Sequence, residues 1–102
     1  MAEVFVLKTT DRTGGIPLVF ESVGPDISGK AVVLKANYNS ADPYPASTHP
    51  DTLQTLANEI INRNPESLSL LERSGMGSTR RVLERCRVYE NLAPLRVDIV
   101  VL

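Results

Sequence analysis

The feature that most constrains the fold is a strand-loop-helix unit in residues 31–63. Residues 31–34 read AVVL, an unbroken apolar run that is typical of a strand covered on both faces of a parallel sheet. A loop rich in Pro and Asn follows over residues 35–47. Apolar residues then recur with helical spacing, so a helix packed on a sheet is expected. These residues are Leu53, Leu56, Ala57, Ile60 and Ile61.

The ends of this helix carry start and stop signals. Thr48 has the position of an N-cap, Pro50 falls in the first turn, and Asp51 falls at N3 of a layout that resembles a capping box. Asn64 and Pro65 are expected to end the helix.

The flanking sequence predicts further strands and helices. Strands are expected at residues 4–7, 67–71 and 95–102. One helix is expected from about residue 16 to the stop at Gly24, and another from about Ser78, with a connector at residues 89–94. Strands that alternate with helices imply right-handed crossovers. The predicted fold is therefore α/β, with a largely parallel four-stranded sheet in βαβαβαβ order, helices on both faces, and residues 31–34 at the centre.

Size and composition favour a single small domain or the N-terminal part of a larger α/β domain. The chain has 102 residues and a net charge of -1, so no nucleic acid or anionic membrane is expected as a partner. Neither a signal peptide nor a membrane span is recognisable, which predicts a cytoplasmic protein. The last predicted strand is wholly apolar at its end, which predicts a fragment, a homodimer, or a missing C-terminal region that pairs with this strand.

The candidate site lies where the strands end. Ligands of open parallel sheets bind beyond the carboxyl ends of the strands, and here the segments 8–12, 35–48 and 72–78 follow the predicted strands. Lysine, amide and hydroxyl groups near a helix start favour a small anionic ligand. We expect His49 and Glu72 to be the acid or base of any catalysis, with Lys35 as the anion clamp. The ligand-binding candidates are Lys35, Asn37, Thr48, Ser74 and Gly75.

Each of these residues also has a plain structural interpretation. Thr48 could simply cap the helix, and His49 could be an exposed residue of its first turn. Gly75 and Gly77 between a strand and a helix are typical of a phosphate-binding turn, but the third glycine of GxGxxG is replaced by Arg80.

The remaining chemistry-bearing residues do not predict a further site. The carboxylates near His49 are scattered in the sequence and are expected to be solvated or capping, so no metal site is expected. Cys86, the single cysteine, is expected in the core and cannot hold an iron-sulfur cluster alone. The arginine-rich stretch 80–87 lacks the aromatic residues that stack on nucleic-acid bases, which favours a solvated helix face.

The stretch GKAVVLKANYNSADPYPASTHPDTLQTLANEII, followed by LLERSGMGSTRRVLE, resembles the N-terminal part of the DUF362 family, a domain of unknown function. The most specific parts are the Lys35-x-Asn37 pair, the helix start at residues 47–50, and the turn at residues 72–75. Family sequences commonly have proline where this chain has Ala36. The resemblance implies a piece of an iron-sulfur-associated or redox-associated protein, whose cluster lies elsewhere in longer relatives and not in this chain.

The leading hypothesis is a part of a larger protein that binds an anion or another small ligand, with an enzyme role left open. The alternative is an interaction or assembly domain with no activity of its own, in which an exposed strand pairs with a partner.

Overall fold

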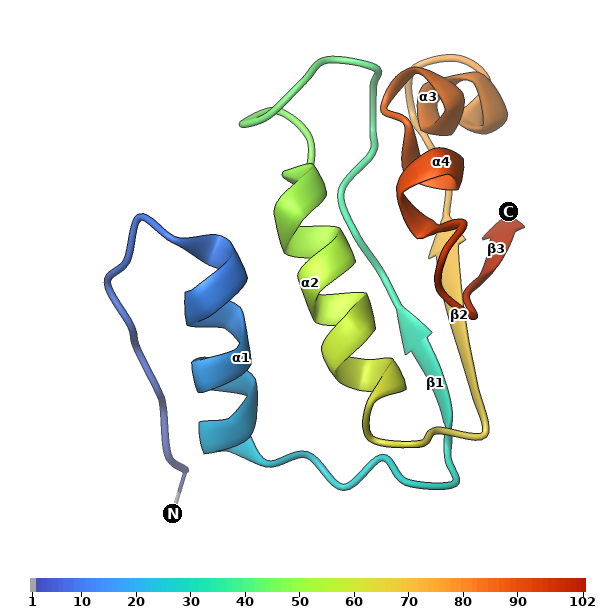
Figure 1. Ribbon diagram of the computed structural model, residues 1–102. Helices are drawn as coiled ribbons and strands as arrows, with labels where there is room; N and C mark the ends of the chain where they lie inside the picture. Colours follow the sequence, from blue (N-terminus) through green and yellow to red (C-terminus); the bar gives the residue numbers. More distant parts are fainter. Residues whose placement is uncertain (1) are drawn as a thin grey trace.

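The computed structural model describes residues 2–102 and shows an α/β fold with helices between the strands of a parallel sheet (Figure 1). The helices and strands are α1 (Arg12–Val23), β1 (Ala31–Leu34), α2 (Pro50–Ile61), β2 (Ser67–Glu72), α3 (Thr79–Arg85), α4 (Val88–Leu92) and β3 (Asp98–Val101). None of the described helices has the length and apolar character that a membrane span requires.

The sheet has three strands in the order β1-β2-β3, and both pairs are parallel. Val32 pairs with Leu68, and Leu70 pairs with both Leu34 and Ile99. The prediction of a parallel α/β fold is therefore confirmed. The prediction that residues 31–34 form the central strand is wrong, because β2 lies at the centre and β1 at an edge.

Helices α2, α3 and α4 pack on one face of this sheet and α1 packs against α2, so the prediction of helices on both faces is wrong. Side chains of α2, α3 and α4 form one core with Leu68 and Leu70 of β2. When strands follow one another in spatial order, successive right-handed crossovers turn to the same face. The other face leaves Val33 62% exposed and Val100 40% exposed, although parallel sheets are usually covered on both sides.

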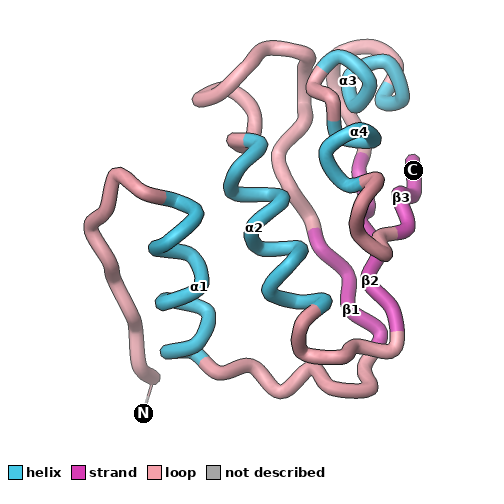
Figure 2. The backbone as a smooth tube through the Cα atoms, viewed as in Figure 1, coloured by secondary structure: helices cyan, strands magenta, loops and turns pink. Residues whose placement is uncertain are grey.

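Residues 4–7 form no strand, which corrects the predicted four-stranded sheet to three strands. They run as an extended loop beside α1 (Figure 2), with Val4 83% exposed and Val6 89% exposed. A β-branched run favours extended backbone but does not supply a partner strand. This segment instead lies close to α1, since a Cβ on Gly15 would meet the Leu7 Cδ2 atom at 3.3 Å.

The first helix forms as predicted but begins earlier than residue 16. Asp11 is its N-cap, and its Oδ1 atom accepts a hydrogen bond from the Gly14 N–H at 3.1 Å. Gly24 ends the helix in the left-handed region at a φ of 58°, a conformation that glycine adopts without a steric penalty. Gly14 and Gly15, which precede the predicted helix, belong to the first turn of α1.

The start of α2 differs from the predicted capping box. His49 is the N-cap, and its Nδ1 atom accepts from the Asp51 N–H at 3.1 Å, with Pro50 as the first helical residue. Asp51 is therefore at N2 and not at N3. Thr48 does not cap, because its hydroxyl accepts a hydrogen bond from the Asn37 N–H at 2.8 Å.

The C-terminal part adds one helix to the prediction. α3 begins after Ser78 as expected, but the predicted connector at residues 89–94 contains most of α4. Val88 and Leu92 are both buried and lie one helical turn apart, which anchors α4 to the core. The last strand is shorter than predicted, because β3 covers only Asp98–Val101.

Candidate functional site

The carboxyl ends of β1 and β2 bring a lysine and a glutamate together. Glu72, the last residue of the central strand, is fully buried, and its Oε1 atom lies 2.8 Å from the Lys35 Nζ atom. The Lys35 side chain remains 60% exposed. Its ammonium also donates to the Ala36 carbonyl, which leaves one of its three N–H groups for another acceptor. Two of the predicted site residues thus meet at the edge where the sequence placed the site.

Both carboxylate oxygens of Glu72 accept a hydrogen bond. Its second oxygen, Oε2, accepts a hydrogen bond from the Arg73 N–H at 3.2 Å. A carboxylate without a partner would be costly to bury, so the ion pair with Lys35 and this backbone donor together stabilise its charge. Glu72 therefore fixes the position of the Lys35 ammonium, while only Lys35 is open to solvent.

Ser74 and Gly75 join the loop after β2 to the loop after β1. The Ser74 hydroxyl donates to the Tyr38 carbonyl at 2.6 Å, and the Ser74 N–H donates to the Thr79 Oγ1 atom at 2.9 Å. The Gly75 N–H donates to the Asn39 Oδ1 atom at 2.8 Å. These polar groups, which the sequence assigned to ligand binding, are already paired within the protein.

Asn37 and Thr48 close the loop between β1 and α2. Besides the bond to the Thr48 hydroxyl, the Asn37 carbonyl accepts from the Thr48 N–H at 3.0 Å, and the Asn37 amide donates to the Ala46 carbonyl at 3.3 Å. The structure therefore brings these two predicted site residues together, as a clasp at the base of the loop.

His49, the N-cap of α2, lies beside an aromatic ring. The rings of Tyr44 and His49 meet edge to face, with centroids 5.0 Å apart, and the Arg12 guanidinium lies over the Tyr44 ring, 4.7 Å from its centre. Because Nδ1 accepts the capping hydrogen bond from Asp51, the neutral ring carries its proton on Nε2. His49 is half-buried and can donate through that atom.

Sequence reasoning missed two buried residues of this loop. Tyr38 is only 2% exposed, and burial, with smaller effects of Cys86 and Glu72, raises its pKa to about 12. Ser47 is also buried, and its hydroxyl donates to the Asp42 carbonyl at 2.6 Å. An aromatic residue within a polar loop favours a loop that folds back onto the core, but this signal does not separate buried Tyr38 from Tyr44, which is 52% exposed.

Cys86 was expected in the core, and it is half-buried beside the core side chains. Burial raises the pKa of its thiol. A thiol whose pKa is raised is a poor nucleophile at neutral pH, so it adds no reactive group to the site.

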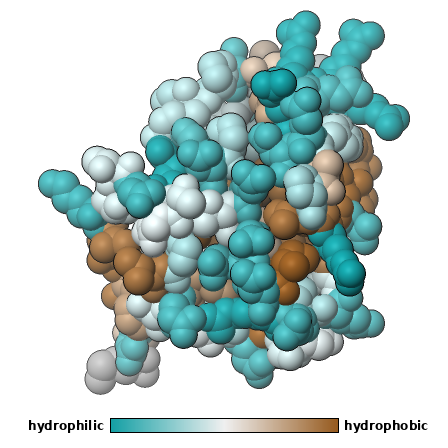
Figure 3. All heavy atoms as spheres, in the orientation of Figure 1, coloured by the Kyte–Doolittle hydropathy of each residue, from teal (hydrophilic) through white to brown (hydrophobic). Residues whose placement is uncertain are grey.

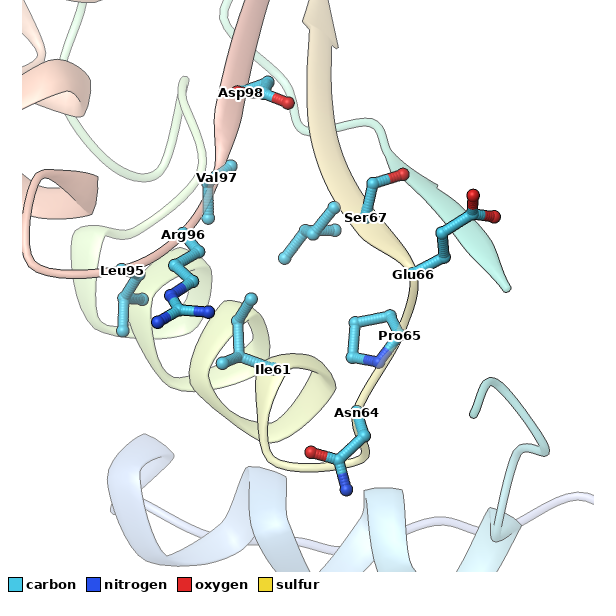
Figure 4. A pocket seen from close by; sticks show the side chains of 10 residues that line it. Ile61, Asn64, Pro65, Glu66, Ser67, Leu95, Arg96, Val97 and Asp98 are labelled. Atoms are coloured by element: carbon cyan, nitrogen blue, oxygen red, sulfur yellow. The ribbon is translucent and has the colours of Figure 1, made fainter. Parts of the chain in front are cut away.

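A hollow of about 520 Å³ lies at the amino ends of β2 and β3, at the opposite end of the strands from Lys35 and Glu72 (Figure 4). It is lined by the amino ends of β2 and β3, the end of α2, and the segment before β3, including Ile61, Pro65, Leu95 and Arg96. The hollow contains none of the predicted site residues.

Residues 2–102 contain no group of three or more His, Cys, Asp or Glu side chains placed to hold a metal ion.

No family model, no curated protein and no solved structure matches this chain. The resemblance to the DUF362 family therefore stays a prediction, carried by the motifs quoted above.

Proposed function

We propose that this chain binds a small anionic ligand at the carboxyl ends of β1 and β2, as one part of a larger α/β protein. One observation carries the proposal: a solvent-facing ammonium, that of Lys35, is fixed by a carboxylate, that of Glu72, which solvent does not reach. A ligand that approaches from solvent meets the cation first. Because Lys35 is already held in place, binding loses less side-chain entropy than it would with a free lysine.

The surrounding loops support a preformed site. The bonds from Ser74 and Gly75 to the Tyr38–Asn39 segment hold the two loops together, and the Asn37–Thr48 clasp holds the start of α2 near the end of β1. In this proposal Lys35 contacts the anion, His49 donates through Nε2, and the other predicted residues keep the loops in place. Glu72 positions Lys35.

The catalytic role that the sequence suggested for His49 and Glu72 remains a proposal without an assigned reaction. The hydrogen bonds of the described residues join no hydroxyl or thiol nucleophile to His49, so binding is the function that the geometry supports best. The association with a longer iron-sulfur or redox protein rests on the resemblance to the DUF362 family alone.

The proposal can be tested by titrating isotopically labelled protein with inorganic phosphate and with acetate at constant ionic strength. Amide shifts measured by NMR should saturate and should be confined to residues 35–39, 47–51 and 72–75. Lys35→Gln should weaken binding about tenfold or more, because it removes a charge-assisted hydrogen bond. His49→Asn should weaken it less, since Asn preserves the helix cap but not the Nε2 donor.

Lys30→Gln is the matched control, because Lys30 is also exposed and directly precedes β1 at its other end. Equal losses for Lys30→Gln and Lys35→Gln would mean that phosphate responds only to net charge. Shifts that are scattered over the whole chain, or that never saturate, would refute a site at this edge.

The alternative, an assembly domain, is favoured by the uncovered face of the sheet. Val33 and Val100 are exposed there on the two edge strands. A second copy of the chain is the partner that this alternative predicts. Sedimentation equilibrium should then show a dimer that Val33→Asp dissociates, whereas a monomer at every concentration would exclude it.

A further inference from the structure

A second hollow, separate from the carboxyl edge of the sheet, lies between residues 7–9, α1 and the first half of α2. We call it the α1 hollow. It measures about 380 Å³, within the range of about 300–1,000 Å³ that small-molecule sites occupy. Its lining is mainly apolar, with Leu7, Ile16, Val19, Phe20 and Leu56 among the residues. Figure 3 shows apolar surface gathered over the N-terminal segment and α1.

One charged residue belongs to this lining. Arg12, the first residue of α1, is half-buried, and its guanidinium stacks on the Tyr44 ring at 4.7 Å. No carboxylate of the described residues forms an ion pair with this guanidinium within 4 Å. Stacking on an aromatic ring holds a guanidinium while its edge stays free for hydrogen bonds.

We infer that the α1 hollow binds a medium-chain carboxylate, with the hydrocarbon chain in the hollow and the carboxylate on the Arg12 guanidinium. The planar guanidinium matches a carboxylate with two parallel hydrogen bonds. Thr52 also lines the hollow, whereas the Thr9 hydroxyl is already hydrogen-bonded to the Asp11 backbone. The apolar remainder offers no partner to a polar chain, so an alkyl chain is the chemistry that it fits.

This inference is independent of the site at Lys35, because none of the residues that line the α1 hollow belongs to that site. The two are linked only through Tyr44, whose ring contacts both Arg12 and His49. A carboxylate at Arg12 would therefore bind one aromatic ring away from the start of α2.

The test uses the full chain and calorimetric titration with octanoate, decanoate and decanol below their micelle concentrations. Decanoate should bind about tenfold or more tightly than decanol, because only the carboxylate gains the charge-assisted bonds. Each methylene that enters the hollow should strengthen binding by about fourfold. Octanoate should accordingly bind more weakly than decanoate.

Two pairs of variants locate the ligand. Val19→Phe fills the hollow, whereas Leu18→Phe places the same ring at a neighbouring position that is 63% exposed and outside the lining. Arg12→Gln removes the guanidinium, whereas Arg80→Gln removes one from α3. Only Val19→Phe should abolish binding of both ligands, and only Arg12→Gln should make decanoate no tighter than decanol.

Several results would overturn the inference. They are the absence of decanoate binding, equal affinity for decanoate and decanol in the unchanged protein, and equal effects within either pair of variants. If Val19→Phe fails to fold, as judged by circular dichroism, Arg12→Gln still decides the question, since Arg12 lies outside the hydrophobic core. Loss of phosphate binding at Lys35 would leave these results unaffected.

Discussion

The buried hydrogen bond from Ser74 to the Tyr38 carbonyl should stabilise the fold much more than an equivalent exposed bond. Ser22 provides the comparison, because its hydroxyl donates to the Leu18 carbonyl at 2.8 Å on the exposed surface of α1, while the Ser74 bond measures 2.6 Å and is buried. The two serines make the same kind of bond in different surroundings. Ser74→Ala and Ser22→Ala therefore remove the same chemical groups.

The magnitude follows from what each substitution leaves behind. Ser74→Ala leaves the buried Tyr38 carbonyl without that donor, which costs about 1–3 kcal/mol of the free energy of unfolding. After Ser22→Ala, water replaces the hydroxyl at Leu18, and the higher helix propensity of alanine adds up to about 0.5 kcal/mol in favour of the helix. We therefore expect Ser74→Ala to destabilise the protein and Ser22→Ala to leave its stability unchanged or slightly raised.

Urea unfolding at 25 °C, followed by circular dichroism, measures both effects. With a slope of about 2 kcal/mol per M of urea for a domain of this size, Ser74→Ala should lower the midpoint by about 0.5–1.5 M. The slope itself should not change. Equal midpoints for the two variants would refute the assignment of Ser74 to the junction between the two loops. The Ser74 hydroxyl would then again be a candidate for ligand binding.

Three further predictions concern the core and the loops. Leu70→Ala should lower the free energy of unfolding by about 2–5 kcal/mol, and Leu71→Ala should lower it by less, because Leu71 is only half-buried. Equal losses in urea unfolding would show that the sheet face opposite the helices is also covered. Gly75→Ala should destabilise the junction, since its Cβ would collide with the Asn39 Oδ1 atom, and hydrogen exchange at the Gly75 position should accelerate. The Tyr38 pKa of about 12 exceeds the usual value near 10, so stability should fall as pH rises from 10 to 12, and Tyr38→Phe should reduce that fall.

The sign of the pH effect follows from the protonation states. Below pH 10 the Tyr38 phenol is protonated in both the folded and the unfolded chain, so it contributes no pH dependence. Between pH 10 and 12 the unfolded chain loses this proton while the folded chain keeps it, which favours unfolding. A steeper fall in Tyr38→Phe than in the unchanged protein would contradict the pKa assigned to Tyr38.

The sequence predicted most elements of the fold because their signals are local. The helical spacing of residues 53–61, the stop at Gly24 and the cap at Ser78 all depend on residues within a few positions of one another, and each corresponds to an observed element. Pairing of residues 4–7 with the sheet depends on a distant strand. A short β-branched and aromatic run gives no information about that partner, so residues 4–7 predict a strand that does not form.

The coverage of the sheet was mispredicted for a related reason. The AVVL run of β1 indicates a strand with both faces apolar, but whether both faces are covered depends on the spatial order of the strands. With β1, β2 and β3 side by side in sequence order, both crossovers fall on one face. The handedness of crossovers is a general rule, but no local pattern in the sequence indicates the spatial order of the strands.

The sequence predicted that Lys35 and Glu72 lie together where their strands end, and they do, but it did not predict which of the other polar side chains are engaged within the protein. Residue type shows which groups can bind an anion, but it does not show which of them are already engaged. Ser74, Gly75, Asn37 and Thr48 all use polar groups to join loops to one another. Such bonds span up to 36 residues of sequence, beyond the reach of local patterns.

The hydrogen bonds within and between these loops reduce the number of polar groups that can bind a ligand, but they do not prevent binding. A loop whose polar groups were all free would lose much conformational entropy on meeting a ligand, whereas a loop joined at several points loses little. The Lys35 side chain is still 60% exposed, and its ammonium retains a donor for a ligand. The Lys35 ammonium is already paired with Glu72, so we expect this edge to bind ligands that carry an acceptor oxygen and to bind apolar ligands weakly.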